Sequence, residues 1–165
     1  MTQPPSPGAS KSSAPDSETN KSDQDAVQIA ISIARIYIKD LSFESPKAPQ
    51  VFQQQQNNPE MKVEIKVTPR NLGENFYEVA LNILLDAKVK NESFFVLEIE
   101  QAGVFEIKNT TPEQLQQILL VFCPQSLFPY ARANIDQVLT MGSLPPVMLA
   151  PVNFETMKAA NQNVH

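Results

Sequence analysis

The strict alternation of apolar and polar residues between positions 61 and 68 constrains the fold most. Met61, Val63, Ile65 and Val67 alternate with lysine, glutamate and threonine. A period of two places successive side chains on opposite faces of a strand, so this segment is expected to be a β-strand with one apolar and one polar face. Three more segments extend the same pattern into a sheet.

The first of these segments begins at Val27 and changes phase twice. Its apolar residues alternate up to Ile33, resume at Ile36 and Ile38, and shift again at Leu41. A β-bulge inserts one residue and flips the facing pattern, so a strand with one or two bulges is expected. The phase shifts also predict apolar side chains on both faces of this strand.

Two long alternating segments follow the strand at 61–68. A third strand is predicted at 76–89, and a turn at 90–92 leads into a fourth strand at 94–107. Gly103 in the fourth strand predicts a bulge or a close approach by another segment. Four sequential strands with short connections after the first loop predict an antiparallel sheet.

A helix is predicted after the sheet. Thr111–Gln114 has the form of a capping box, with proline at the first helical position. Pro124 and Pro129 are expected to bend or divide this helix, which stops at Gly142. The predicted long helix is therefore interrupted by proline.

Asn153 can cap a short final helix at 154–160. The fold class is thus α+β, a four-stranded antiparallel sheet followed by one long helix and one short C-terminal helix. Residues 26–160 are expected to form a single domain. Residues 1–25, with four prolines and no aromatic or branched aliphatic residue, are interpreted as a disordered tail, and 161–165 as a frayed one.

Catalytic and cofactor chemistry find little support in the chain. Cys123 and His165 are the only cysteine and histidine, and neither a His/Cys metal set nor a glycine-rich phosphate loop is present in the sequence. Cys123 stands in an apolar helical run, which favours a packed core residue over a nucleophile. No catalytic residue, metal or cofactor is therefore predicted.

The charge and the apolar runs of the chain indicate which partners it can bind and in which compartment it is found. A net charge of -5 disfavours binding to nucleic acid. The longest apolar run after the N-terminus, 118–123, is far too short to cross a bilayer, and the N-terminus lacks the apolar stretch of a secretory signal. We expect a cytoplasmic protein without direct membrane insertion.

Glu98 and Glu100 lie two residues apart on one strand and so share a face. Three interpretations are open: a carboxylate pair for acid/base chemistry, an ordinary solvated face, or a docking surface for a basic partner. Asp40 and Glu44 at the end of the first strand support the docking interpretation. Acidic groups on a flat surface accelerate association with a basic segment more than they tighten it.

The four strands carry more apolar surface than the two helices can cover. Another copy of the protein or a client chain could cover the remainder. The helical stripe at 130–139 is a candidate seam between subunits, and ordinary packing within the chain is an equal alternative. The proline-containing connection at 45–60 is long for an idle loop and is a candidate for function or mobility.

Four motifs resemble the SecB family of bacterial export chaperones. Residues 35–44, with Pro46 and Pro49 after them, and 98–105 are similar to the first and fourth strands of the family. Cys123-Pro124 with 127–132, and then 149–154, are similar to its helical signatures. The resemblance spans roughly residues 27–157, nearly all of the chain expected to be ordered.

The resemblance implies a SecB-like fold assembled as a homotetramer, a dimer of dimers through the long helix. It also implies a bacterial cytoplasmic chaperone that binds unfolded precursors in apolar grooves without ATP, keeps them competent for translocation and delivers them to the SecA ATPase. The implied SecA-docking residues are Asp40, Glu44, Val96, Glu98 and Glu100. The implied groove residues are Val51, Phe52, Met61, Val63 and Ile65. The implied interface residues are Leu127, Phe128, Tyr130, Ile135 and Val138.

Two departures from the family concern its binding sites. The run 53–58 stands where the family often has a tryptophan in the crossover loop, and the polar tail at 158–165 lacks the longer helix that gives related proteins a second SecA contact. Two alternative functions remain. One is a SecB-like chaperone for a non-export client, such as an aggregation-prone toxin–antitoxin component, and the other is a small acid/base hydrolase.

Overall fold

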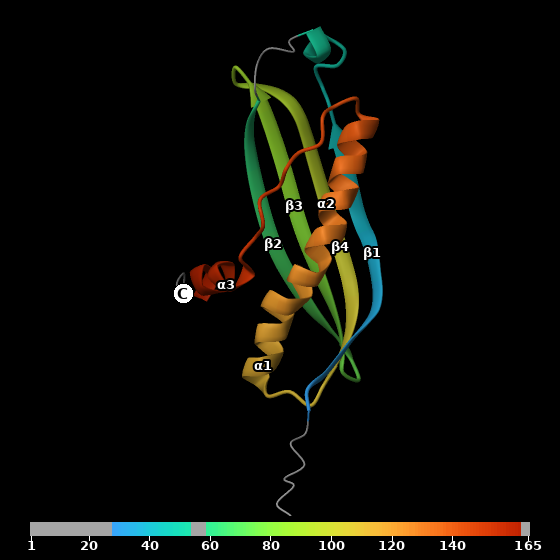
Figure 1. Cartoon of the computed structure of the whole chain (residues 1–165), viewed down its shortest axis with the longest axis vertical. Helices are drawn as coiled ribbons and strands as arrows, with labels where there is room; N and C mark the ends of the chain where they lie inside the picture. Colours follow the sequence, from blue (N-terminus) through green and yellow to red (C-terminus); the bar gives the residue numbers. More distant parts are fainter. Residues whose placement is uncertain (1–27, 54–58, 163–165) are drawn as a thin grey trace, which may run out of the picture.

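The computed structural model describes residues 28–53 and 59–162, with the side chains of Val51, Asn161 and Gln162 excepted. The predicted α+β fold is confirmed: one sheet is followed by helices that collect on one of its faces (Figure 1). The elements in chain order are β1 (Ala30–Glu44), η1 (Gln50–Gln53), β2 (Glu60–Gly73), β3 (Phe76–Val89), β4 (Glu92–Lys108), α1 (Pro112–Gln117), η2 (Ile118–Phe122), α2 (Cys123–Met141) and α3 (Phe154–Gln162). The disordered tail predicted at 1–25 lies outside the described residues, and α3 extends two residues past the predicted end of the domain.

All strand pairs in the sheet are antiparallel, in the order β1-β4-β3-β2. The β2–β3 and β3–β4 connections are tight turns between neighbouring strands. The connection from β1 to β2 passes from one edge of the sheet to the other, which explains why it is long (Figure 1). Both edge strands therefore have one neighbour only.

The prediction of a strand with one or two bulges is confirmed, since β1 has two, but one consequence drawn from them is wrong. The β1–β4 register shifts between Ile33 and Arg35 and again between Ile38 and Asp40. Each shift absorbs one change of phase, so the apolar residues of β1 stay on one face. They pair with the alternate residues of β4 whose side chains face the helices, as the registers Ile33 with Phe105 and Leu41 with Ile99 illustrate. The prediction of apolar side chains on both faces of β1 is therefore wrong.

The hydrophobic core lies between this face of the sheet, called the inner face below, and the helices. Alternate residues of β3 and β4 are fully buried, among them Leu81, Ile83, Leu97 and Ile99. The helices and the segment after α2 supply the other side of the core, including Leu127, Ile135, Leu139, Leu149 and Phe154. The long central strands are therefore held by one layer of helix and linker.

The predicted capping box opens α1: the Thr111 hydroxyl accepts from the Gln114 amide, and the Gln114 side chain accepts from the Thr111 amide. The prolines do not divide the helix. They follow a π-helical turn, η2, in which the Cys123 amide donates to the Ile118 carbonyl five residues back. Pro124 has no backbone N–H, so it cannot donate to the carbonyl four residues before it. The widened π-helical turn before it takes up this missing hydrogen bond, and the helix bends there without being interrupted. Asn153 caps α3 as predicted.

Gly103 permits the close approach of α2 to the sheet. A Cβ atom at this position would lie 2.9 Å from Leu127 Cδ2 and 3.2 Å from the Arg35 carbonyl oxygen.

Gln101, two residues before Gly103 on β4, is 1% exposed. Its Nε2 donates to the Tyr37 carbonyl at 2.8 Å, and its Oε1 accepts from Asn134 Nδ2 at 2.8 Å. Gln101 thus ties β1 to α2 through the middle of the core.

Replacing Gln101 by methionine, which has a similar size, should destabilise the protein by about 1–3 kcal/mol, because the Tyr37 carbonyl and the Asn134 amide lose their partner. Chemical denaturation measures the free energy of unfolding. Gln137→Met on the exposed face of α2 is the matched control. Equal stability of the two variants would contradict this role of Gln101.

Candidate functional site

The five predicted docking residues lie together on the face of the sheet opposite to the helices, called the outer face. Asp40 pairs in register with Glu100, and Glu44 pairs with Val96. Glu98 stands between Val96 and Glu100 on β4, opposite Ser42. Two neighbouring strands therefore present four carboxylates around one apolar side chain.

The second bulge of β1 adds a cation to this acidic group. Lys39 is the extra residue of the bulge, and its ammonium lies 3.1 Å from Glu78 Oε2 and 3.5 Å from Glu100 Oε1. Lys39 is thus shared between the two carboxylates and compensates the charge of Glu100 in part. Among the residues that the structure describes, Asp40, Glu44 and Glu98 make no ion pair, so the uncompensated negative charge lies with them.

Glu78 is the one buried charged residue in the described part of the chain, and it lies on the outer face. The Tyr37 hydroxyl donates a short hydrogen bond to its Oε1, and Lys39 binds its Oε2. The hydrogen bond from Tyr37, together with the bond and charge of Lys39, holds the pKa of Glu78 below its usual value despite burial. The same hydrogen bond raises the pKa of Tyr37. This network, which the sequence analysis missed, fixes Lys39 beside the acidic residues.

The predicted groove residues of β2 lie along the inner face at the sheet edge. Val63 is 42% exposed, whereas Met61 and Ile65 are partly buried against the core. Phe52 belongs to η1 and is also exposed, and the side chain of Val51 lies outside what the structure describes. The edge of β2 therefore presents an apolar strip on the side of the sheet that faces away from the acidic group.

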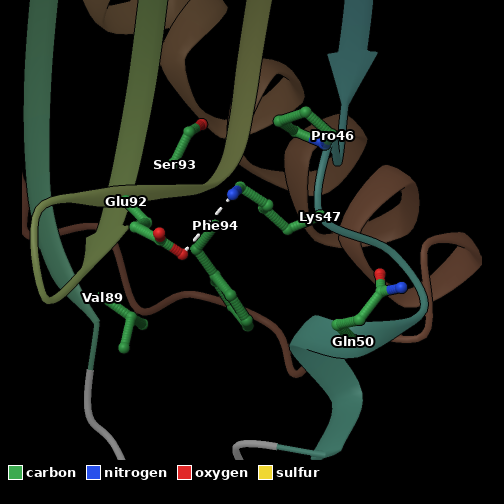
Figure 2. A pocket seen from close by; sticks show the side chains of 7 residues that line it. All are labelled: Pro46, Lys47, Gln50, Val89, Glu92, Ser93 and Phe94. Carbon is green, nitrogen blue, oxygen red and sulfur yellow. Dashed lines mark ion pairs between the residues drawn. The ribbon is translucent and has the colours of Figure 1, made fainter.

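A cavity of about 380 Å³ lies at the end of the sheet, between the segment after β1 and the β3–β4 turn (Figure 2). Val89 and Phe94 form apolar parts of its lining. Lys47 and Glu92 also line it, with 3.6 Å between Lys47 Nζ and Glu92 Oε2. The Oγ of Ser93, which also lines it, accepts or donates no hydrogen bond among the described residues. The sequence alone does not reveal this cavity, because its walls come from the segment after β1 and from both strands that meet at the β3–β4 turn.

Three of the five predicted interface residues are covered by this chain itself. Leu127 and Ile135 are fully buried and Phe128 nearly so, all in the core of this chain. The stripe that suggested a subunit seam is explained by packing against the chain's own sheet, the alternative that the sequence left open. Tyr130, at 52% exposure, and the partly buried Val138 stay available for such a contact.

Part of the uncovered apolar surface lies on the inner face of β1. Ile33, Ile38 and Leu41 are 48%, 43% and 39% exposed, although they share a face with the core residues of β4. The helices lie over the central strands and leave this edge open. The two changes of phase in the sequence of β1 could have predicted this surface. Each bulge inserts one residue and so keeps the apolar residues of the strand on one face.

The described residues offer little reactive chemistry. Cys123 is buried as predicted, and burial raises the pKa of its thiol to about 12. No group of three or more histidine, cysteine, aspartate or glutamate side chains that could hold a metal ion is found in residues 28–53 and 59–162. Within these residues, no helix has the length and apolar character needed to cross a membrane.

The fold resembles that of a solved chaperone. It is similar to a solved Mycobacterium tuberculosis SecB-like chaperone in complex with a peptide from the HigA1 antitoxin, with a TM-score of 0.63 over 74% of this chain and 90% of that chain. The two sequences are 16% identical, so this match shows the fold alone, which is that of a SecB-like chaperone.

The sequence defines the family. Residues 24–164 match the family SecB, described as preprotein translocase subunit SecB. The protein-export protein SecB of Chromobacterium violaceum is 43% identical over 82% of this chain and 90% of its own length, and that of Hahella chejuensis is 44% identical over 80% and 82%. The chain belongs to the SecB family.

The Glu78 network predicts a loss of stability in acid. The pKa of Glu78 is lower in the folded chain than its ordinary value of 4.5, so its contribution is complete above that pH and is lost as pH falls through the folded pKa. Tyr37→Phe removes the main cause of the shift and should flatten the fall in unfolding free energy below pH 4.5. Denaturation midpoints across this range measure the effect, with Tyr77→Phe as control. An unchanged slope for Tyr37→Phe would contradict it.

Proposed function

We propose that this chain is an export chaperone that binds unfolded precursor proteins in the bacterial cytoplasm and delivers them to SecA. The observation that carries this proposal is the division of the sheet: uncompensated carboxylates lie on the outer face, and uncovered apolar side chains lie on the inner face and its edges. Membership of the SecB family, whose named relatives are protein-export proteins, supports the same function.

The client is held by burial of apolar surface. An extended segment of an unfolded precursor lies against the strip formed by Met61, Val63 and Ile65. Phe52 of η1 is proposed to belong to the same groove, and so is its neighbour Val51, whose side chain lies outside what the structure describes. Each Å² of apolar surface buried contributes roughly 25 cal/mol, and several weak contacts across an oligomer raise the total affinity. Binding of this kind acts only on the unfolded chain and requires no nucleotide, because it shifts the folding equilibrium by mass action.

The proposed assembly is a homotetramer. The open stripe of Ile33, Ile38 and Leu41 on the edge strand β1 supports a contact between copies, together with Tyr130 on α2. A contact of this kind covers apolar surface that a single chain leaves in water. Several copies also supply the repeated client contacts.

The receptor is bound by the outer face. Asp40, Glu44 and Glu98, around Val96, form the acidic surface for a basic segment of SecA, and Glu100 belongs to it with its charge compensated in part by Lys39. Carboxylates on a flat face raise the rate of encounter with a basic partner, and this effect weakens with salt. Client and receptor thus occupy opposite faces of one sheet.

Client capture should be lost when a charge enters the apolar strip. The purified protein should slow the refolding of a slow-folding precursor without ATP, and Val63→Asp should weaken that effect on the order of tenfold, the equivalent of about 1.4 kcal/mol. Thr68→Asp places the same charge on the outer face of β2 and should leave capture intact. If the unaltered protein fails to slow refolding, the chaperone function itself is wrong.

Charge reversal on the outer face should separate receptor binding from client capture. Glu98→Lys should weaken SecA binding at least tenfold at low salt, because it opposes a basic partner at the centre of the acidic surface. Glu74→Lys, in the β2–β3 turn, changes the net charge equally and serves as control. Unchanged SecA binding by Glu98→Lys, with capture intact, would favour the alternative of a non-export client such as a toxin–antitoxin component.

A further inference from the structure

The outer face carries a basic side as well as an acidic one. The outward residues of β2 include Lys62, Lys66 and Arg70, at the sheet edge opposite to β1. Lys62 is compensated by Glu64, with 2.6 Å between Nζ and Oε1. Lys66 and Arg70 make no ion pair with any residue that the structure describes. Arg70 lies in register with Glu78, so the uncompensated positive charge of β2 lies with Lys66.

The strand registers place one of these cations in line with the acidic surface. Lys66 pairs with Asn82, Asn82 with Glu100, and Glu100 with Asp40, so the four residues form a single row across all four strands. Glu100 shares Lys39 with Glu78, whereas Lys66 and Asp40, at the two ends of the row, make no ion pair with any residue that the structure describes. Three strand spacings separate them, roughly 14 Å.

Asn82, in the middle of this row, has a polar atom without a hydrogen-bond partner among the described residues. The Oδ1 atom of Asn82 is buried, yet it accepts no hydrogen bond from the described residues. Buried polar atoms in native proteins nearly always have a hydrogen-bond partner in the protein or in ordered water. The row thus has an unsatisfied acceptor at its centre and free charges of opposite sign at its ends.

We infer that the segment docked on the outer face is two-signed, with basic groups over Asp40 and Glu98 and an acidic group over Lys66. This inference rests on the proposed docking of SecA and specifies the chemistry of the segment that docks. An extended chain advances about 3.3 Å per residue, so a segment lying across the strands spans the row in about four residues. Lys66 then fixes the position of the segment, because a uniformly basic segment is repelled at β2.

The effect of one charge reversal on SecA binding distinguishes a two-signed segment from a uniformly basic one. Lys66→Glu makes the outer face more acidic, so a uniformly basic partner would bind it more tightly. A two-signed partner loses its contact at β2 and meets repulsion there, and we expect SecA binding to weaken by about fivefold to twentyfold at low salt, mainly through slower association. Lys66 is preferred to Arg70 for this test because Arg70 lies in register with Glu78.

The experiment measures association and dissociation of the unmodified, full-length chain and its variants with purified SecA of the same organism, at two salt concentrations. Lys90→Glu, in the exposed β3–β4 turn, changes the net charge equally and should alter binding less than twofold. Lys66→Arg should keep the affinity. Client capture, measured on the same preparations, should be unchanged in all three variants, which shows that they are folded.

Unchanged or tighter SecA binding by Lys66→Glu, while Glu98→Lys weakens it, overturns the two-signed segment and leaves the proposed docking surface in place. If Glu98→Lys also has no effect, the docking surface itself is wrong. A loss of client capture by Lys66→Glu with normal SecA binding would assign the basic side to acidic clients, and it would equally overturn the inference.

Discussion

The two bulges of β1 are the constraint on which both surfaces depend. Each one takes up a single residue, so the apolar residues before, between and after them all face the helices. Without the second bulge, Asp40 would not share a face with Glu98 and Glu100, because a shift of one residue moves every later side chain to the opposite face. The acidic surface and the apolar stripe of Ile33, Ile38 and Leu41 are thus two results of the same irregularity.

The core holds this irregularity in place through one buried polar residue. Gln101 binds the Tyr37 carbonyl, next to the second bulge, and also Asn134 of α2. On the other side of the sheet, the Tyr37 hydroxyl and Lys39 both bind Glu78. The backbone and the side chain of Tyr37 are therefore fixed from opposite faces. A buried network of this kind is stabilising only while every member is satisfied, which makes the bulge a single defined conformation.

The elements of the fold were predictable because they depend on local pattern: the alternation in the strands, the capping box at Thr111 and the changes of phase in β1. The role of the long helix was not, since an apolar stripe is the same whether its cover is the chain's own sheet or another subunit. Leu127 and Ile135 turned out to be core residues for this reason. The Lys39 pairs join residues on three strands, and the cavity at Phe94 joins three segments, so neither follows without the register.

The separation of the two surfaces bears on how a client is transferred. If client and receptor competed for one surface, the chaperone would have to release the precursor before SecA could bind. In the proposed arrangement, a loaded chaperone can meet its receptor, because the acidic face stays open while the inner face is occupied. The uncompensated charges then govern encounter and orientation, and the apolar contacts govern retention. In this proposal, transfer requires only that the receptor hold the client more tightly than the inner face does, so the energy for release would come from the receptor and not from this chain.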